Sequence, residues 1–194
     1  TAKARREPKL TFTSLAHHLT LDRLRDNLSH MDKTSATGVD GQTVTAVTAN
    51  LDWIAKEVLR RVHTQGYHPS PVRRVWIPKP GKAEKRPSGI PTVVDRALQK
   101  STAQVLEAIY EPDFLNGSFG GRPGRSAHHA LATLNEIVAG KKVSYVLEAD
   151  LRNVFGSLDH TWAMRFVQLR VGDPRILTLL RRWLKAGVMM PDGA

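Results

Sequence analysis

Prolines recur through the segment between Tyr67 and Pro91, and they restrict its backbone more than any other stretch of the sequence is restricted. Proline fixes φ near about −65° and cannot donate a backbone hydrogen bond, so a helix is excluded here. The residues from Val72 to Ile77 are rich in β-formers, and Pro80-Gly81 is a turn dipeptide. The sequence therefore predicts a proline-bounded β-hairpin whose second strand ends at Ile90.

Both arms of the predicted hairpin carry basic side chains. A run of charge is commonly only a solvated face of the protein. Here, however, the prolines hold the arms extended, so the cations are presented together, and rigid cations suit a triphosphate. The basic residues are Arg73, Arg74 and Lys79 on the first arm, with Lys82, Lys85 and Arg86 at the tip and on the second arm.

A run of apolar β-formers from Val143 to Leu147 leads to the carboxylate of Asp150. We expect a buried strand that ends at this acid. Mg²⁺ prefers oxygen ligands, so a carboxylate held at the floor of a cleft, with a neighbouring carbonyl, suits this ion. The simpler alternative, that Asp150 only begins a turn, stays open on spacing alone.

Apolar residues at helical spacing predict helices around these two segments. They predict one helix or two short ones over residues 14–31, a helix over residues 44–62, and helices that begin at Thr92, Ser126 and Asp173. With the hairpin and the strand, this pattern predicts a mostly helical α+β fold. The helix after Ser126 is expected to bury a face made of Ala130, Leu131, Leu134, Ile137 and Val138.

The charge balance narrows the choice of partner. The chain has 29 Lys and Arg residues against 18 Asp and Glu residues, which gives a net charge of +11 and a pI near 10.3. The simplest polyanionic partner is nucleic acid, although a protein that binds anionic lipid, or a ribosomal-type protein, would share this charge. The absence of cysteine excludes disulfides and thiolate zinc sites. No apolar run approaches the roughly 20 residues of a membrane span, so we expect a cytoplasmic bacterial protein associated with nucleic acid and not with a membrane.

Several sequence blocks, in this order, resemble the reverse transcriptases (maturases) encoded by group II introns. The blocks are the loop Ser35 to Gly41, the words Ile77-Pro-Lys-Pro80 and Lys85-Arg-Pro-Ser-Gly-Ile-Pro91, the word Arg122-Pro-Gly-Arg-Ser126, and the stretch from Asp150 through Phe155 to His160. The resemblance implies the fingers of a reverse transcriptase with the first part of its palm. Residues 1–34 would then be an N-terminal arm with helices, residues 35–142 the fingers with an RNA-binding loop, and residues 143–194 a partial palm with a palm strand.

The resemblance also implies roles for individual residues. Asp150 would be catalytic, and its carboxylate would hold two Mg²⁺ ions together with the carbonyl of Leu151. Lys79 and Arg86 would contact the phosphates of the incoming nucleotide. The backbone of Asn153 and Val154 would face the triphosphate, and Phe155 would lie against the sugar. The residues expected to contact nucleic acid are Arg73, Arg74, Lys82, Lys85, Arg122 and Arg125.

The implied function is RNA-directed DNA polymerisation for a group II intron. The partners would be an RNA template and intron RNA, a DNA or RNA primer, and deoxynucleoside triphosphates. The chain begins with Thr1 instead of Met, and the family's second catalytic block of paired acids is not in these residues. We therefore expect a portion of a longer protein that is inactive by itself. Three alternatives stay open: an RNA-binding maturase module that assists splicing, a reverse transcriptase linked to CRISPR or another bacterial element, and a self-associating fragment that forms a homodimer.

Overall fold

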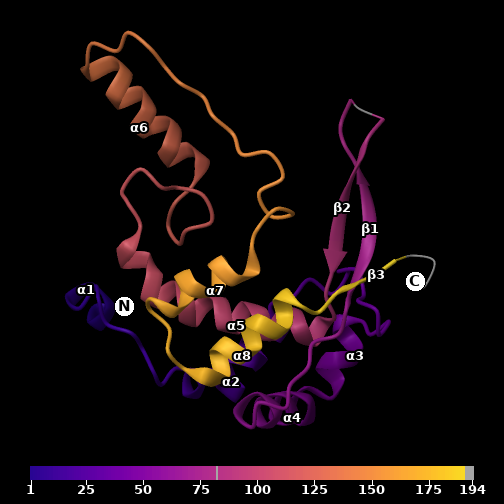
Figure 1. The fold of residues 1–194 in the computed structure, drawn as a ribbon. Coiled ribbons are helices and arrows are strands. Elements are labelled where there is room, and N and C mark those ends of the chain that lie inside the picture. Colours follow the sequence, from indigo (N-terminus) through magenta and orange to yellow (C-terminus); the bar gives the residue numbers. More distant parts are fainter. Residues whose placement is uncertain (82, 191–194) are drawn as a thin grey trace. The chain divides into compact units, whose positions relative to one another are not determined.

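The computed structural model describes residues 1–81 and 83–190. The described chain combines helices with a small β-sheet, which confirms the predicted α+β class (Figure 1). Short 3-10 helices are labelled η. The elements in chain order are α1 (Ala2–Arg6), η1 (Ala16–His18), α2 (Leu21–Ser29), α3 (Val44–Ala49), α4 (Leu51–His63), β1 (Val72–Pro78), β2 (Lys85–Ile90), α5 (Val93–Tyr110), η2 (Glu111–Asp113), α6 (Ala127–Gly140), α7 (His160–Gln168), α8 (Pro174–Leu184) and β3 (Val188–Met189).

The chain divides into two compact units. Residues 9–107 and 160–194 form one, called here the hairpin unit because it contains β1 and β2. Residues 1–8 and 108–159 form the other, called here the Asp150 unit. None of the helices in the described ranges has the length and hydrophobicity needed to cross a bilayer.

The core of the hairpin unit is built by α2, α3, α4, α5 and α8. The side chains of Leu24 and Leu28 on α2, Val47 on α3 and Leu98 on α5 are almost fully buried. Each such side chain contributes about 1.5–3 kcal/mol through removal from water. A buried amide adds specificity, because Asn27 on α2 donates to the hydroxyl of Ser101 on α5 at 2.8 Å.

The N-terminus of α5 is capped by Thr92, as predicted, although the reciprocal bond of the predicted capping box to the backbone N–H of Thr92 is not among the hydrogen bonds of the described residues. The backbone N–H of Asp95 donates to Oγ1 of Thr92 at 3.1 Å, and this hydroxyl donates to the Asp95 carboxylate at 2.9 Å. Asp95 is also a buried junction, since it accepts from the hydroxyl of Tyr67 at 2.9 Å and from the indole N–H of Trp183 at 3.3 Å. The carboxylate therefore joins α5 to α8 and to the segment that enters the hairpin.

A second buried carboxylate, Asp173, caps α8 as predicted. It accepts from the backbone N–H of Arg175 at 2.9 Å. Its other oxygen accepts from the backbone N–H groups of Leu15 and Ala16 at 2.7 and 2.9 Å, so it also holds the start of η1. Burial alone would raise the pKa of Asp173, but these hydrogen bonds and that of the Arg175 side chain outweigh it and lower the pKa to about 2.

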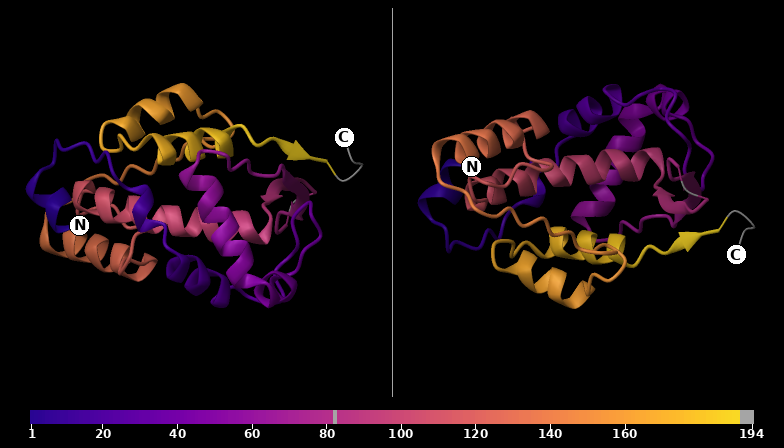
Figure 2. Two further views of the ribbon diagram at one scale, coloured as in Figure 1. Left: turned by 90° about the horizontal axis from the view of Figure 1, so that it is seen from below. Right: turned by 90° about the horizontal axis from the view of Figure 1, so that it is seen from above.

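The sheet has the strand order β2-β1-β3. β1 and β2 pair antiparallel and form the predicted hairpin, whereas β3 pairs in parallel with the start of β1 through Val72 and Val188. Figure 2 shows α8 running directly into β3 near the C-terminal end of the chain. The base of the hairpin is thereby tied to α8, while its distal part is a two-stranded ribbon.

Two predictions for the Asp150 unit are wrong. The segment from Val143 to Leu147 forms no strand, and its Tyr145 and Leu147 side chains are exposed. A strand needs a neighbour for its backbone groups, and within the described chain no segment pairs with this one. The predicted helix does form as α6, but none of its residues is buried, because no described element of the Asp150 unit covers the face that contains Leu131 and Leu134.

Candidate nucleotide and nucleic-acid interface

The register of the hairpin decides which of its cations act together. Ile77 lies opposite Arg86, Pro78 lies opposite Lys85, and the ladder continues where the N–H of Lys79 donates to the carbonyl of Glu84 at 3.1 Å. Side chains alternate between the two faces of a strand. Lys79 and Arg86 therefore belong to one face of the hairpin, and Lys85 belongs to the other.

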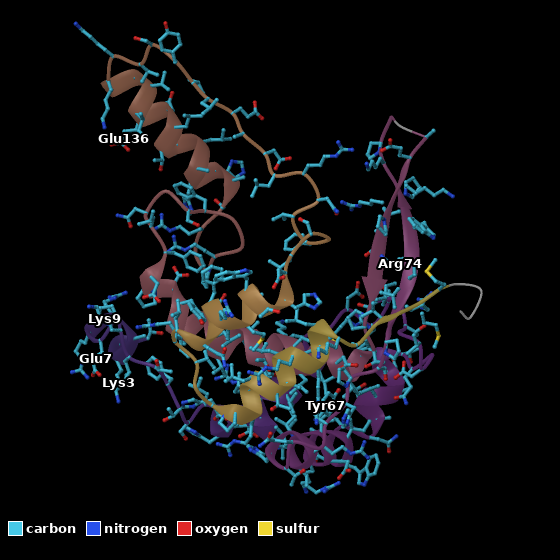
Figure 3. The ribbon with its side chains drawn as sticks, viewed as in Figure 1. Lys3, Glu7, Lys9, Tyr67, Arg74 and Glu136 are labelled. Carbon is cyan, nitrogen blue, oxygen red and sulfur yellow. The ribbon has the colours of Figure 1, made fainter. Side chains whose placement is uncertain are left out.

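The remaining predicted cations of the hairpin have different surroundings. Arg74 lies on β1, on the same face as Lys85, and is labelled in Figure 3. Arg86 and Lys85 are exposed, so their charges face solvent. The sixth predicted cation, Lys82, lies outside the described residues.

Arg73 is engaged at the base of the hairpin. Its Nε and Nη2 both donate to the carbonyl oxygen of Thr37, at 2.9 and 2.7 Å. Arg96 on α5 donates to the neighbouring carbonyl of Ala36 at 3.0 Å. Two arginines thus hold the loop of residues 35–41 against the hairpin and α5, a role for Arg73 that a charge pattern does not reveal.

The loop of residues 35–41 also meets the start of α5 at very short range. A Cβ atom added to Gly38 would lie 2.6 Å from the Cα of Thr92 and 2.7 Å from its backbone N. Glycine is required here because two backbones approach each other without space for a side chain. The loop is consequently part of the packed hairpin unit.

Lys79 forms an ion pair at the end of the hairpin. Its Nζ lies 2.9 Å from Oε2 of Glu84, and this hydrogen bond with Lys79 lowers the pKa of the Glu84 carboxyl. Glu84 therefore stays ionised at neutral pH and competes for the cation that is expected to contact a phosphate. The sequence analysis did not identify this acid. Its position five residues after Lys79, across a tight turn, could have indicated that the two side chains pair.

Asp150 precedes a compact turn in the Asp150 unit. It is exposed and belongs to neither a helix nor a strand. Beyond it, Asn153 adopts a left-handed φ of 53°, and its carbonyl accepts from the backbone N–H of Ser157 at 3.0 Å. A Cβ on Gly156 would lie 2.5 Å from Oδ1 of Asn153, so a side chain here would displace that of Asn153. The turn presents the side chain of Phe155, which is 92% exposed.

The residues at this turn offer the ligands that Mg²⁺ prefers. The carboxylate of Asp150 and the carbonyl of Leu151 are adjacent hard oxygen donors, and Mg²⁺ in nucleotide sites is commonly held by one or two carboxylates with substrate phosphates. Among residues 1–81 and 83–190, no group of three or more His, Cys, Asp or Glu side chains gathers to hold an ion. These two donors could therefore supply some, but not all, of the ligands of a magnesium site.

The two arginines of the glycine-rich loop differ in their engagement. Arg122 is nearly buried, with a side chain that is only 6% exposed. It pairs with Glu111 at 2.7 Å and donates to the carbonyls of Leu115 and Ser118 at 2.8 Å. The hydrogen bond from Arg122 lowers the pKa of the Glu111 carboxyl. Arg125 lies over the ring of Phe119, with 5.4 Å to the centroid. The loop then ends at Ser126, which caps α6 as predicted.

Comparison with known proteins shows similarity to a reverse transcriptase family and to an intron-encoded protein. Residues 77–192 match the family described as reverse transcriptase (RNA-dependent DNA polymerase). The group II intron-encoded protein LtrA of Lactococcus lactis subsp. cremoris is 35% identical over 134 residues, 69% of this chain and 22% of the relative. Protein YkfC of Escherichia coli K12 is 38% identical over 154 residues, 77% of this chain and 40% of the relative.

A plant relative extends the comparison. The nuclear intron maturase 2, mitochondrial, of Arabidopsis thaliana is 30% identical over 95 residues, 49% of this chain and 13% of the relative. The matched part of the chain thus spans less than half the length of each of these three relatives.

Proposed function

Since this chain belongs to the reverse transcriptase (RNA-dependent DNA polymerase) family, we propose that it is the fingers and first palm portion of an RNA-directed DNA polymerase encoded by a group II intron. Residues 35–142 would be the fingers and residues 143–194 part of the palm. The observation that carries the proposal is the hairpin register, which assigns Lys79 and Arg86 to one face of the two-stranded ribbon. The name of the LtrA relative supports the assignment to an intron.

In this proposal the hairpin binds the incoming deoxynucleoside triphosphate. Arg86 offers a planar fork of donors that matches phosphate oxygens, and Lys79 adds a compact charge next to it. Phe155 would lie against the sugar, and the backbone at Asn153 and Val154 would face the triphosphate. Binding in this way orients the α-phosphate for attack by the primer hydroxyl, and orientation supplies much of the rate in phosphoryl transfer.

Asp150 and the carbonyl of Leu151 would hold Mg²⁺ in the intact polymerase. When bound, magnesium supplies Lewis-acid stabilisation of charge at the reacting phosphate. The task of Asp150 is to fix the position of this charge. A carboxylate that is exposed, as Asp150 is, can reach an ion without first losing a protein partner.

The template and primer would be held mainly through their backbones. We propose this role for Arg74, Lys82, Lys85 and Arg125, and a supporting role in the local structure for Arg73 and Arg122. Backbone contacts make affinity fall steeply with salt. The proposed partners are the RNA template, intron RNA and a DNA or RNA primer, in the cytoplasm of a bacterium. We also propose that the chain can form a homodimer. Light scattering with and without RNA tests this self-association.

The nucleotide-binding role is tested by titration of a fluorescent deoxynucleoside triphosphate in the presence of Mg²⁺. Arg86→Gln should weaken binding about tenfold or more, because a charge-assisted bidentate contact is lost. Lys56→Gln removes an equal charge from the exposed face of α4 and serves as the control. Equal affinities for the wild-type chain and for Arg86→Gln would contradict the proposal.

A second candidate function is recognition of intron RNA by a maturase module. It is favoured by the loop of residues 35–41, because hydrogen bonds from Arg73 and Arg96 to two of its carbonyls restrict it before a partner binds. Filter binding of structured intron RNA and of random RNA at matched salt separates the two functions. A preference for the intron that is lost with Arg73→Gln supports the maturase role, and equal affinity for both RNAs opposes it.

A further inference from the structure

Helices α7 and α8 lie side by side in the hairpin unit, as both views in Figure 2 show. A hollow of about 320 Å³ lies between them. Its lining from α7 includes Thr161, Arg165 and Gln168, which recur at helical spacing, and it also includes Arg181 of α8 and Lys185, the residue just after this helix. Basic side chains from two elements therefore face one space.

A second hollow continues this basic surface. It has a volume of about 520 Å³ and is also lined by Arg181 and Lys185, and it reaches His68 in the segment that enters β1. The same two cations line both hollows, so the hollows adjoin at Arg181 and Lys185 and together make one basic surface. We call it the α7–α8 groove, defined by Arg165, Arg181 and Lys185.

The charge of the groove is not balanced locally. Among the described residues, no Asp or Glu lines either hollow, and no described carboxylate pairs with the three defining cations. Other arginines of α8 are engaged elsewhere, since Arg175 pairs with Asp173 and Arg182 donates to the carbonyls of Gln65 and Tyr67. The cations of the groove are thus the ones left facing solvent.

The dipoles of α7 and α8 favour cations at these positions, but they do not explain why cations of both helices line one hollow. Cations in the last turn of α8 offset the partial negative charge of its C-terminus, which accounts for Arg181 and Lys185. Arg165 stands in the last turn of its own helix, α7, where the same effect favours a cation, and it lies over the ring of Trp162 at 4.8 Å from the centroid. Contact with the aromatic ring restricts the orientations of this guanidinium.

We infer that the α7–α8 groove binds the sugar-phosphate backbone of RNA, as a contact separate from the hairpin. The choice of RNA as the polyanion rests on the proposed function, whereas the anionic character of the ligand rests on the groove itself. Binding here is independent of base sequence, because phosphate contacts fix position without reading bases.

The test measures binding of a labelled 20-nucleotide uridine RNA to the whole chain by fluorescence anisotropy across a salt series. The triple variant Arg165→Gln, Arg181→Gln, Lys185→Gln should bind about tenfold more weakly at 0.1 M salt. Its slope of log affinity against log salt should be smaller by about 2, since each contact to single-stranded RNA contributes about 0.7. The charge-conserving variant Arg165→Lys, Arg181→Lys, Lys185→Arg should keep most of the affinity, and Lys56→Gln should keep all of it.

Lys185→Gln alone guards against misfolding of the triple variant, because this exposed side chain contributes nothing to the core. It should lower the slope by about 0.7. If the wild-type chain binds RNA and the triple variant binds equally well, the inference fails and the proposed function stands. If the wild-type chain does not bind RNA at 0.1 M salt, both fail. A triple variant that loses affinity only for vesicles of anionic phospholipid, and not for RNA, also overturns the inference.

Discussion

Lys79 and Glu84 face each other across the tip of the hairpin, with the ammonium nitrogen 2.9 Å from a carboxylate oxygen. This ion pair holds a cation that a triphosphate would need. Removal of the acid by Glu84→Gln should strengthen binding of a magnesium-bound deoxynucleoside triphosphate about twofold to fivefold at low salt, the range expected for one exposed pair. The gain should shrink as salt rises.

The matched control for Glu84→Gln is Glu107→Gln, which removes an exposed acid from α5. Isothermal titration of each variant with the nucleotide gives the comparison. Weaker binding by Glu84→Gln would show that the acid positions Lys79 instead of competing for it.

Gly38 should not tolerate a side chain. Gly38→Ala brings a Cβ to 2.6 Å from the Cα of Thr92, and backbone on both sides cannot yield easily. Such overpacking costs about 1–3 kcal/mol of unfolding free energy. At Gly66 a Cβ would meet only ordinary contacts, the nearest at 3.5 Å, so Gly66→Ala should change stability by less than about 0.5 kcal/mol. Urea denaturation measures both variants, and equal stability of the two would refute the close packing of the loop.

Asp173 should make the stability of the hairpin unit depend on acid pH. Its folded pKa of about 2 lies below the ordinary value of 3.8, so the unfolded chain takes up the proton first. The contribution of Asp173 is therefore fully present above about pH 4 and is lost as the pH falls towards 2. It amounts to about 2 kcal/mol.

The substitution Asp173→Ala should cost about 2–4 kcal/mol at pH 7, because it leaves backbone N–H groups of Leu15 and Ala16 without their acceptor. Thermal melts of this variant should also show a weaker loss of stability between pH 4 and pH 2 than the wild type shows. Asp52→Ala, which removes an exposed partner of Arg25, provides the contrast and should cost less than about 1 kcal/mol.

The isolated 194-residue chain should not extend a primer. Two-metal phosphoryl transfer needs more carboxylates than the single predicted ligand Asp150 provides. A primer-extension assay with an RNA template, Mg²⁺ and all four deoxynucleoside triphosphates should yield no product above a no-protein blank. Robust synthesis that depends on magnesium would contradict this expectation.

Features set by neighbouring residues were predictable from the sequence. The hairpin and the caps at Thr92 and Asp173 were confirmed, because proline, turn and cap chemistry act over a few residues. The resemblance to reverse transcriptases was confirmed as well, because short sequence motifs in a fixed order can be recognised without knowing how the chain packs.

Features that depend on distant partners were not predictable. The apolar run from Val143 to Leu147 has strand propensity, but a strand forms only beside another strand. None of the described strands pairs with this run. The same limit applies to the roles of charged residues. The sequence does not reveal that Arg73 donates hydrogen bonds to a carbonyl of the loop while Arg86 stays exposed. The site roles of these residues remain predictions.

The most direct test of the account is primer extension on an RNA template by the intact polypeptide that carries these residues, with and without Asp150→Asn. The change removes a charged oxygen ligand and keeps the side-chain volume. The account predicts that kcat falls about a thousandfold or more while RNA binding is unchanged. A variant that extends primers at the wild-type rate would contradict the assignment of Asp150, and with it the polymerase mechanism proposed for this chain.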